Sequence, residues 1–441
     1  MVCADETLSA NELAAVRLTC KELNTASTQE FARRYFKDPF VMMSRRSLQA
    51  LVDICKHPIF GSHVCKIQML NMRIYTNRLQ GLTHEMVIAA ENRQVTELRR
   101  MKGQMQWFMD MLEEQIDFEQ SEEPLGLLKE AFHCLKRSKR SVVIAAQSLH
   151  VPYAPIGLRK AFDGCEEQPH EVLTEPDMPS VLQLLLDAAS SSGCVVQRIE
   201  IGVSDASWPS SPQSWLVESI QQERRPSSMH AEEVHLNLQW HAISGHANKL
   251  AAQWLPLIIE STTRSLKRFS LSSDCDPDGF RGHLLDNVSF SDWYEGLEEI
   301  SLARLCLREQ QLHHFLKVHR TSLKRLNLTE MTIVGDWDRL ISWISRNFEL
   351  EQFTFERGYV PSNPGWNAKI YRARAWYTTG FQFHSKDEMS QDIELFINSQ
   401  TAARQAEEKR KRKEIEQQEK DRSSRRSSRL SRTEGRKHYQ Q

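Results

Sequence analysis

The residues best spaced for metal chemistry lie in the acidic sequence DCDPDG. Asp274, Asp276 and Asp278 alternate with other residues, as in the opening of a calcium-binding loop. Gly279 follows them, but the bidentate glutamate that such a loop needs at its twelfth position is replaced by Leu285. We therefore interpret the segment as an acidic turn after a strand, and we predict no metal site.

The histidines and cysteines show no spacing that is typical of a catalytic centre. His313 and His314 are adjacent and point to different faces of a predicted helix, and His319 lies too far round to join either. The nine cysteines are scattered and never spaced as C-x-x-C, which favours reduced thiols over disulfides or a zinc site. Motifs of zinc proteases, serine hydrolases and phosphate-binding loops are missing from the sequence. The sequence predicts no catalytic residue, no cofactor and no enzyme activity.

The C-terminal tail carries two motifs whose chemistry depends on charge. A run of basic residues is typical of a nuclear import signal or of nonspecific nucleic-acid binding, although a solvated charged helix fits it equally well. Further on, arginines precede a pair of serines, which suits kinases that select basic sequences, and phosphorylation there would cancel the positive field of the tail. The residues are Lys409, Arg410, Lys411, Arg412 and Lys413 for import, and Ser427 and Ser428 for phosphorylation.

Charge divides the 441-residue chain into an acidic body and a basic tail. From Arg404 onward there are 14 Lys/Arg and 7 Asp/Glu, whereas the preceding residues hold 43 and 51, within a net charge of −1. No run approaches the ~18 apolar residues of a membrane span, and the N-terminal sequence lacks the apolar region of a signal peptide. We expect a protein of the cytoplasm, the nucleus or both.

Six short segments share one apolar pattern, and we expect them to form the strands that position a binding surface. Each has apolar residues at positions one, four and six, and their starts lie 26 to 35 residues apart. The pattern resembles the leucine-rich-repeat phrase, in which alternation marks a half-buried strand. Helical stretches at 179–189, 214–220, 249–259, 311–319 and 337–348 lie between segments, and such crossovers permit parallel pairing. The segments are VQRIEI (196–201), AEEVHL (231–236), LKRFSL (266–271), LEEISL (297–302), LKRLNL (323–328) and LEQFTF (350–355).

Two earlier segments extend the pattern to about eight strands. VCKIQM at 64–69 has the full apolar frame, and KRSVVI at 139–144 places Val142 and Ile144 at the fourth and sixth positions. One such unit cannot bury its own apolar face, so the units must stack. The expected fold class is α/β, a solenoid of irregular leucine-rich-like strand–helix repeats. A short helical module precedes the solenoid, and a disordered or helical basic tail follows it.

The third residue of each phrase is polar, and its charge alternates from strand to strand until the last. Because positions four and six point to the core, the third position should face the open side of the sheet. Neighbouring strands lie about 4.8 Å apart, so opposite charges there attract. Two interpretations remain, a ladder that fixes strand order and a partner-binding surface, and the mixed charge argues against nucleic acid on this face. The residues are Arg198, Glu233, Arg268, Glu299, Arg325 and Gln352.

The repeat phrase also defines the domain organisation. Insertions at 70–123 and 150–179 interrupt the solenoid, and the first contains a predicted amphipathic helix over 95–118. The final segment has too few apolar residues to fold by itself and is expected to be largely disordered. The parts are a helical module at 1–36, the solenoid at 37–360, a cap at 361–400 and the basic tail at 401–441.

The N-terminal module resembles part of a known interaction motif. LSANELAAVRLTCKELNTASTQEFARRYF (8–36) looks like the second half of an F-box, the helical module that ties substrate receptors to SCF-type ubiquitin ligases. With the following SLQALVDICKHPIFGSHVCKIQM (47–69), the chain is similar to fungal F-box proteins with degenerate leucine-rich repeats. The Leu-Pro pair and first helix of an F-box do not precede Leu8. The matching residues are Leu8, Leu13, Val16, Arg17, Leu18, Cys20, Lys21, Leu23 and Phe31.

The resemblance implies a non-catalytic substrate receptor of a cullin–RING ubiquitin ligase. The F-box part would bind the SCF adaptor subunit, and the repeats would bind a protein substrate. The shortened F-box leaves a second hypothesis open, a ligase-independent repeat scaffold for protein–protein interaction in the nucleus. Neither hypothesis involves a membrane, and nucleic acid would bind only nonspecifically through the tail. The residues implied in adaptor binding are Leu8, Leu13, Val16, Leu18, Cys20 and Leu23.

Overall fold

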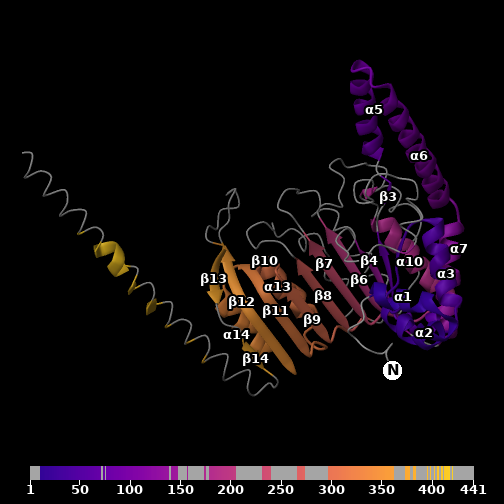
Figure 1. The fold of residues 1–441 in the computed structure, drawn as a ribbon. Helices are drawn as coiled ribbons and strands as arrows, with labels where there is room; N and C mark the ends of the chain where they lie inside the picture. Colours follow the sequence, from indigo (N-terminus) through magenta and orange to yellow (C-terminus); the bar gives the residue numbers. More distant parts are fainter. Residues whose placement is uncertain are drawn as a thin grey trace, which may run out of the picture.

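One large β-sheet organises the molecule (Figure 1). Within the described part of this computed structural model, the sheet has twelve strands and is mostly parallel, with helices packed on it, so the predicted α/β class is confirmed. The structure describes residues 10–70, 73–74, 76–138, 141–147, 156, 173–174, 178–204, 231–239, 266–273, 296–361, 373–377, 381–383, 395, 398, 402, 405, 406, 409, 410, 412–417 and 420.

The parallel strands cross the sheet in chain order. They are β1 (Phe40–Met42), β2 (Lys66–Leu70), β4 (Val142–Gln147), β6 (Val196–Ser204), β7 (Glu233–Gln239), β8 (Arg268–Ser273), β9 (Glu299–Ala303), β11 (Arg325–Val334) and β12 (Gln352–Pro361). β10 (Cys306–Arg308) pairs in parallel with β11, whereas β13 (Ala373–Tyr377) and β14 (Phe381–Phe383) pair antiparallel with β12. The antiparallel strands thus occupy the edge of β12 that β11 leaves open. β3 (Arg73–Ile74) and β5 (Leu173–Thr174) form a separate pair.

All eight predicted strand segments contribute to this sheet. The six segments between 196 and 355 pair in the predicted register. Apolar fourth positions are directly opposite one another, as Ile300 is to Phe269 and to Leu326. Shifting a strand by one residue would turn its apolar residues to the opposite face, so the buried frame specifies the register.

The predicted register of the segment 139–144 is wrong. The pattern places Val142 and Ile144 at the fourth and sixth positions, but Ile144 lies opposite Ile199, a fourth-position residue, and Ala146 takes the sixth position. An offset of two residues leaves the same side chains facing the core, so alternation alone does not distinguish the two registers. An irregularity in the pairing between β4 and β6 accompanies the shift.

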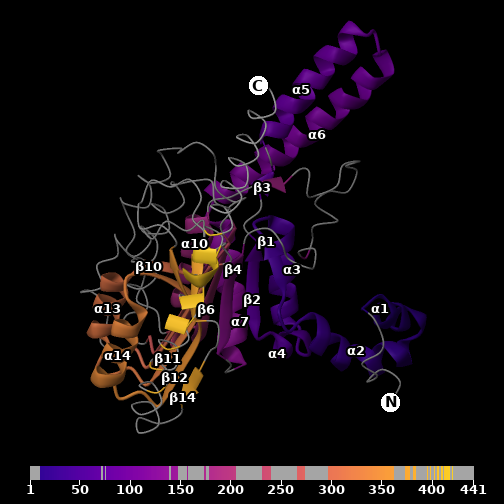
Figure 2. The same ribbon diagram turned by 90° about the vertical axis from the view of Figure 1, so that its left-hand side faces the viewer.

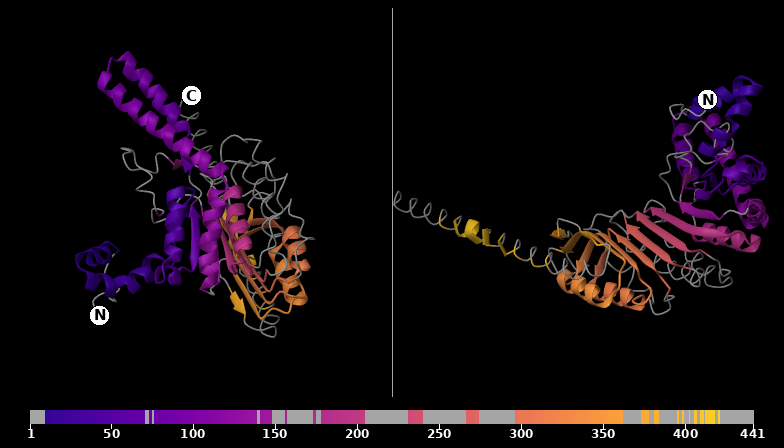
Figure 3. Two further views of the ribbon diagram at one scale, coloured as in Figure 1. Left: turned by 90° about the vertical axis from the view of Figure 1, so that its right-hand side faces the viewer. Right: turned by 90° about the horizontal axis from the view of Figure 1, so that it is seen from below.

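Among the described residues, five helices cover one side of the sheet. They are α3 (Arg45–Lys56), α7 (Glu123–Arg137), α10 (Met178–Ser192), α13 (Glu309–Val318) and α14 (Trp337–Asn347). The right panel of Figure 3 shows the sheet as a curved row of strands with helices along its outer side. Buried side chains of these helices join the fourth- and sixth-position residues of the strands in one continuous core. The predicted helices over 179–189, 311–319 and 337–348 are confirmed as α10, α13 and α14, whereas those over 214–220 and 249–259 lie outside the described residues.

In the last three repeats, strand pairing continues beyond the predicted six-residue segments. The chain bends at Arg304, directly after β9, and at Glu330 within β11, where the φ angles are 55° and 52°. Arg357 of β12 has a φ of 55° at the equivalent place. After each bend the chain continues into β10, the second half of β11 or the end of β12, which pair side by side. Each repeat therefore adds a second stretch of strand to the sheet.

Gly358 of β12 follows this bend at a site of close packing. A Cβ added there would lie 2.7 Å from the Phe355 ring and 3.2 Å from the indole of Trp337. Trp337 is fully buried and donates a hydrogen bond from its Nε1 to the carbonyl of Tyr359 at 2.9 Å. The indole of α14 therefore packs directly over the backbone of β12, which requires glycine at position 358.

Two helical hairpins project from the body (Figure 2). α1 (Ala10–Thr19) and α2 (Lys21–Tyr35) form the N-terminal hairpin, which reaches the body through α4 (Phe60–His63). α5 (Thr76–Glu91) and α6 (Val95–Gln120) form a longer hairpin within the first insertion. The predicted helix over 95–118 is confirmed as α6, whereas α5 has no counterpart in the prediction.

Candidate functional site

The open face of the sheet carries the polar residues predicted at the third position of each phrase. Each of them is the Cα partner of the next across consecutive parallel strands, which confirms that they form a row. No helix of the described part covers this inner face in Figure 3. The row consists of Arg198, Glu233, Arg268, Glu299, Arg325 and Gln352, on β6, β7, β8, β9, β11 and β12.

Ion pairs join most of this row into a ladder. Arg198 donates from Nε to Glu233 at 2.5 Å, and Arg268 forms an ion pair with the same carboxylate. Arg325 donates from Nε to Glu299 at 2.9 Å. Since the arginines are half-buried and hydrogen-bonded, these contacts are stronger than ion pairs at a freely exposed surface.

Glu233 is buried, contrary to the expectation that the whole row faces solvent. Its side chain is only 5% exposed because the two arginines pack on either side of it. Burial by itself raises the pKa of Glu233, but the hydrogen bond and charge of Arg198 and the charge of Arg268 outweigh burial and hold the pKa below its usual value. Glu233 therefore stays ionised at neutral pH and joins β6 to β8 through these two arginines.

A second ion pair extends the network toward the N-terminal strands. Lys66 of β2 donates to Glu200 of β6 at 2.6 Å, although β4 lies between these strands. Between them, β4 presents Val143 opposite Lys66 and the small, fully buried Ala145 opposite Glu200. Arg198 contacts the same carboxylate of Glu200 at 3.4 Å. The sequence offers no signal for this bridge, since its partners are separated by 134 residues.

The rest of the open face is made of small polar side chains. Asn327 donates from Nδ2 to the Ser301 hydroxyl at 3.0 Å, and the Ser272 hydroxyl lies 3.3 Å from the Asn237 amide oxygen. These residues are half-buried and occupy adjacent strands. The face thus combines internally neutralised charge with hydroxyl and amide groups, which suits hydrogen bonding to an extended polypeptide.

The residues implied in adaptor binding are distributed unevenly over the N-terminal hairpin. Leu13 is fully buried in the hairpin, and Val16 is half-buried. Leu18 is 88% exposed, Leu23 is 40% exposed, and Cys20 lies exposed between them at the junction of α1 and α2. Leu8 lies outside the described residues. The exposed apolar group is therefore concentrated at the corner of the hairpin.

An aromatic cluster attaches this hairpin to the body. The guanidinium of Arg17 stacks 4.0 Å from the ring centre of Phe31 on α2 and 5.8 Å from that of Phe60 on α4. Phe36 lies between the two rings, 5.6 Å from Phe31 and 4.6 Å from Phe60. Burial lowers the pKa of Arg17, although a guanidinium stays protonated at neutral pH. The hairpin thus has a defined orientation, which sequence analysis of 8–36 alone missed because Phe60 lies outside that motif.

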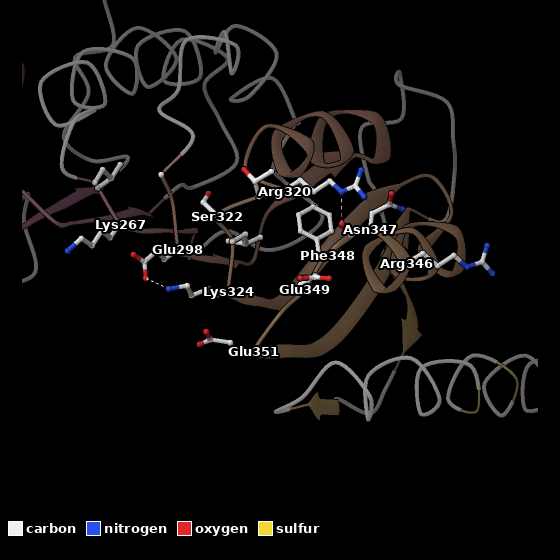
Figure 4. A pocket seen from close by; sticks show the side chains of 14 residues that line it. Lys267, Glu298, Arg320, Ser322, Lys324, Arg346, Asn347, Phe348, Glu349 and Glu351 are labelled. Carbon is white, nitrogen blue, oxygen red and sulfur yellow. Dashed lines mark hydrogen bonds and ion pairs between the residues drawn. The ribbon is translucent and has the colours of Figure 1, made fainter.

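A cavity of about 980 Å³ opens where the C-terminal strands begin (Figure 4). Its charged lining residues are largely paired, since Lys324 donates to Glu298 at 3.2 Å and Arg320 donates to the carbonyl of Asn347 at 2.7 Å. The lining residues contain no cysteine or histidine and show no nucleophile beside a general base. We assign no chemistry to this cavity.

The remaining predicted residues fall in three groups. His313 lies against the Trp343 ring at 3.9 Å, and His319 is buried, so both pack within the last repeats. The described residues of the basic run, Lys409, Arg410, Arg412 and Lys413, are exposed and helical. Outside the described residues lie Lys411, Ser427, Ser428 and the acidic segment 274–279.

Searches for metal sites, membrane spans and relatives return no positive finding. Within the described residues, no group of three or more His, Cys, Asp and Glu could hold a metal ion. None of the helices in that part of the chain is long and apolar enough to cross a membrane. No model of a known protein family and no curated protein matches the chain.

Proposed function

We propose that this chain is a non-catalytic substrate receptor of an SCF-type ubiquitin ligase. The open face of the sheet would hold a protein substrate, and the N-terminal hairpin would hold the adaptor subunit. The observation that carries the proposal is the open inner face, where polar residues of consecutive parallel strands form a continuous row while helices pack on the opposite side. Ubiquitin transfer itself would belong to other subunits.

The repeat geometry supports a solenoid built for protein binding. Leu297, Ile300, Leu302, Leu305 and Leu307 follow an eleven-residue pattern that resembles the leucine-rich-repeat consensus, with leucine where that consensus has asparagine or cysteine. Within the described residues, the repeats place their strands on the inner face, and α10, α13 and α14 lie on the outer face. Solenoids of this kind present an extended concave surface, and such surfaces typically bind other proteins.

The N-terminal hairpin supports a tether to a second protein. Two large apolar side chains, Leu18 and Leu23, are exposed together with Cys20 at one helical corner. Exposed apolar groups on a rigid element mark docking sites, and a few such anchors carry most of the affinity of an interface. The stacking of Arg17 between α2 and α4 holds this corner away from the substrate face.

Binding to the purified SCF adaptor tests the proposal. We expect the full chain to retain the adaptor in a pull-down and the variant Leu18→Glu/Leu23→Glu to lose it, because charged side chains cannot enter an apolar pocket. Val195→Glu is the matched control, since Val195 is equally an exposed apolar residue but lies just before β6. Failure of the full chain to bind, or equal binding by the double variant, would leave the ligase-independent scaffold.

A further inference from the structure

The α5–α6 hairpin exposes apolar side chains far from the core. Val95, Met109 and Ile116 of α6 are all exposed, and with Lys102 they recur at seven-residue intervals along one helix face. α6 also packs on α5, and its side chains Met101 and Phe108 are buried. α6 therefore has a second stripe of the kind that pairs with another helix.

Charge on this outer face is divided along the length of the helix. Arg99 and Lys102 lie in the N-terminal half of α6, whereas Asp110, Glu113 and Asp117 lie in its C-terminal half, and all are exposed. Within the described part of the chain, Arg99, Lys102 and Glu113 take no part in an ion pair.

Gly103 leaves an open position on the same surface of α6. No atom lies within 4 Å of where its Cβ would be, so nothing in the chain itself requires glycine there. Glycine within a helix is less favourable than alanine. A partner helix that packs closely against α6 at this point would account for the missing side chain.

We propose that α6 pairs with α6 of a second copy of this chain, antiparallel and about a two-fold axis near Gln106. This arrangement places Arg99 opposite the partner's Glu113 and Lys102 opposite the partner's Asp110. Gly103 then faces the partner's Met109. The contact spans Val95 to Asp117, about 33 Å of helix at 1.5 Å per residue.

The symmetry of the contact makes the charge pattern self-complementary. In a two-fold interface each contact occurs twice. The basic half of each α6 therefore meets the acidic half of the other. A parallel pair would instead place like charges beside each other. Complementary charge sets orientation and partner choice, while the apolar stripe and the approach at Gly103 supply packing.

Charge-reversal variants of the full chain test the proposal by light scattering after size-exclusion chromatography. The wild-type chain is expected to be a dimer. Arg99→Glu/Lys102→Glu and Asp110→Lys/Glu113→Arg are each expected to be monomeric, because like charges then meet across the axis. An equimolar mixture of the two variants is expected to recover the dimer, because every opposite pair is restored.

Glycine variants test the close approach independently. Gly103→Leu is expected to abolish the dimer without unfolding the chain, because the site is open in a single copy. Gly126→Leu is the matched control, since Gly126 is also helical and its Cβ position is equally open, and it should remain dimeric. Circular dichroism verifies that each variant is folded.

Three results would overturn the proposal. The first is a folded wild-type chain that stays monomeric at high micromolar concentration. The second is a mixture of charge variants that fails to associate. The third is loss of the dimer on deletion of residues 404–441, which would identify the basic tail as the occupant of the acidic half of α6.

Discussion

His319 is a buried imidazole that makes the stability of the last repeats depend on pH. It is fully buried at the end of α13 and meets the Phe315 ring edge-on at 5.3 Å. Its carbonyl accepts hydrogen bonds from the amides of Ser322 and Leu323, which lead into β11. Burial lowers the pKa of His319 from 6.5 to about 4, so the folded protein holds the ring neutral.

We expect unfolding experiments to show this shift directly. Below pH 6.5 the unfolded chain binds a proton that the folded chain does not, so stability falls as pH decreases toward 4, by up to about 3 kcal/mol. His319→Leu should reduce this loss between pH 7 and pH 5, measured by urea denaturation. The exposed His314→Gln should keep it, and an unchanged pH dependence in His319→Leu would contradict the assignment.

Ion pairs of the polar row link β6, β7 and β8, which also share the apolar core. Glu233 of β7 lies between Arg198 of β6 and Arg268 of β8, so one carboxylate neutralises two neighbouring strands. Removing it leaves two half-buried guanidinium groups without their common acceptor. A buried ion pair is costly to break from one side, because the remaining charge loses its partner without regaining full hydration.

Glu233→Gln is therefore expected to destabilise the protein by about 2 kcal/mol in equilibrium denaturation at neutral pH. Because the folded pKa of Glu233 is depressed, this contribution is present above the pKa of an unfolded carboxyl and is lost as the pH falls below it. Glu232→Gln is the control, because Glu232 forms an exposed pair with Lys267 at 3.0 Å. Equal destabilisation by both variants would contradict a special role for Glu233.

At the scale of the whole molecule, the core and the hairpins differ in how they are held. One continuous core runs from α3 to β12, whereas α1 and α5 make their main helical contacts with α2 and α6. Local opening is easiest where few apolar contacts must be broken. The body should therefore unfold as one unit, with the hairpins opening at lower cost.

Hydrogen exchange tests this difference. Amides of β7, β8 and β11 are expected to exchange slowest, and those of α1 and α5 much faster, under native conditions. The charge-reversal variants of α6 are the suitable background, because any pairing of hairpins would add protection there. Exchange of α5 amides as slow as those of β11 would show that the hairpin belongs to the cooperative unit.

The eight strand segments of the repeat pattern could be predicted from the sequence, as could the register of the six between 196 and 355. Residues such as Ile300 and Leu302 alternate within one strand, and the next segment repeats the same frame, so local pattern and stacking specify the register together. The polar row from Arg198 to Gln352 follows directly from that register. The helix at α6 was likewise predictable from the spacing of its apolar residues.

Features that depend on neighbours distant in the chain could not be predicted from the sequence and became visible in the tertiary structure. The two-residue offset of Val142 is invisible to a pattern of period two, and the burial of Glu233 requires arginines on two other strands. Lys66 reaches Glu200 across β4, which presents Val143 opposite Lys66 and Ala145 opposite Glu200. Which side of α6 remains open depends on how α5 packs, since a helix pattern identifies apolar positions but not the partner that covers them.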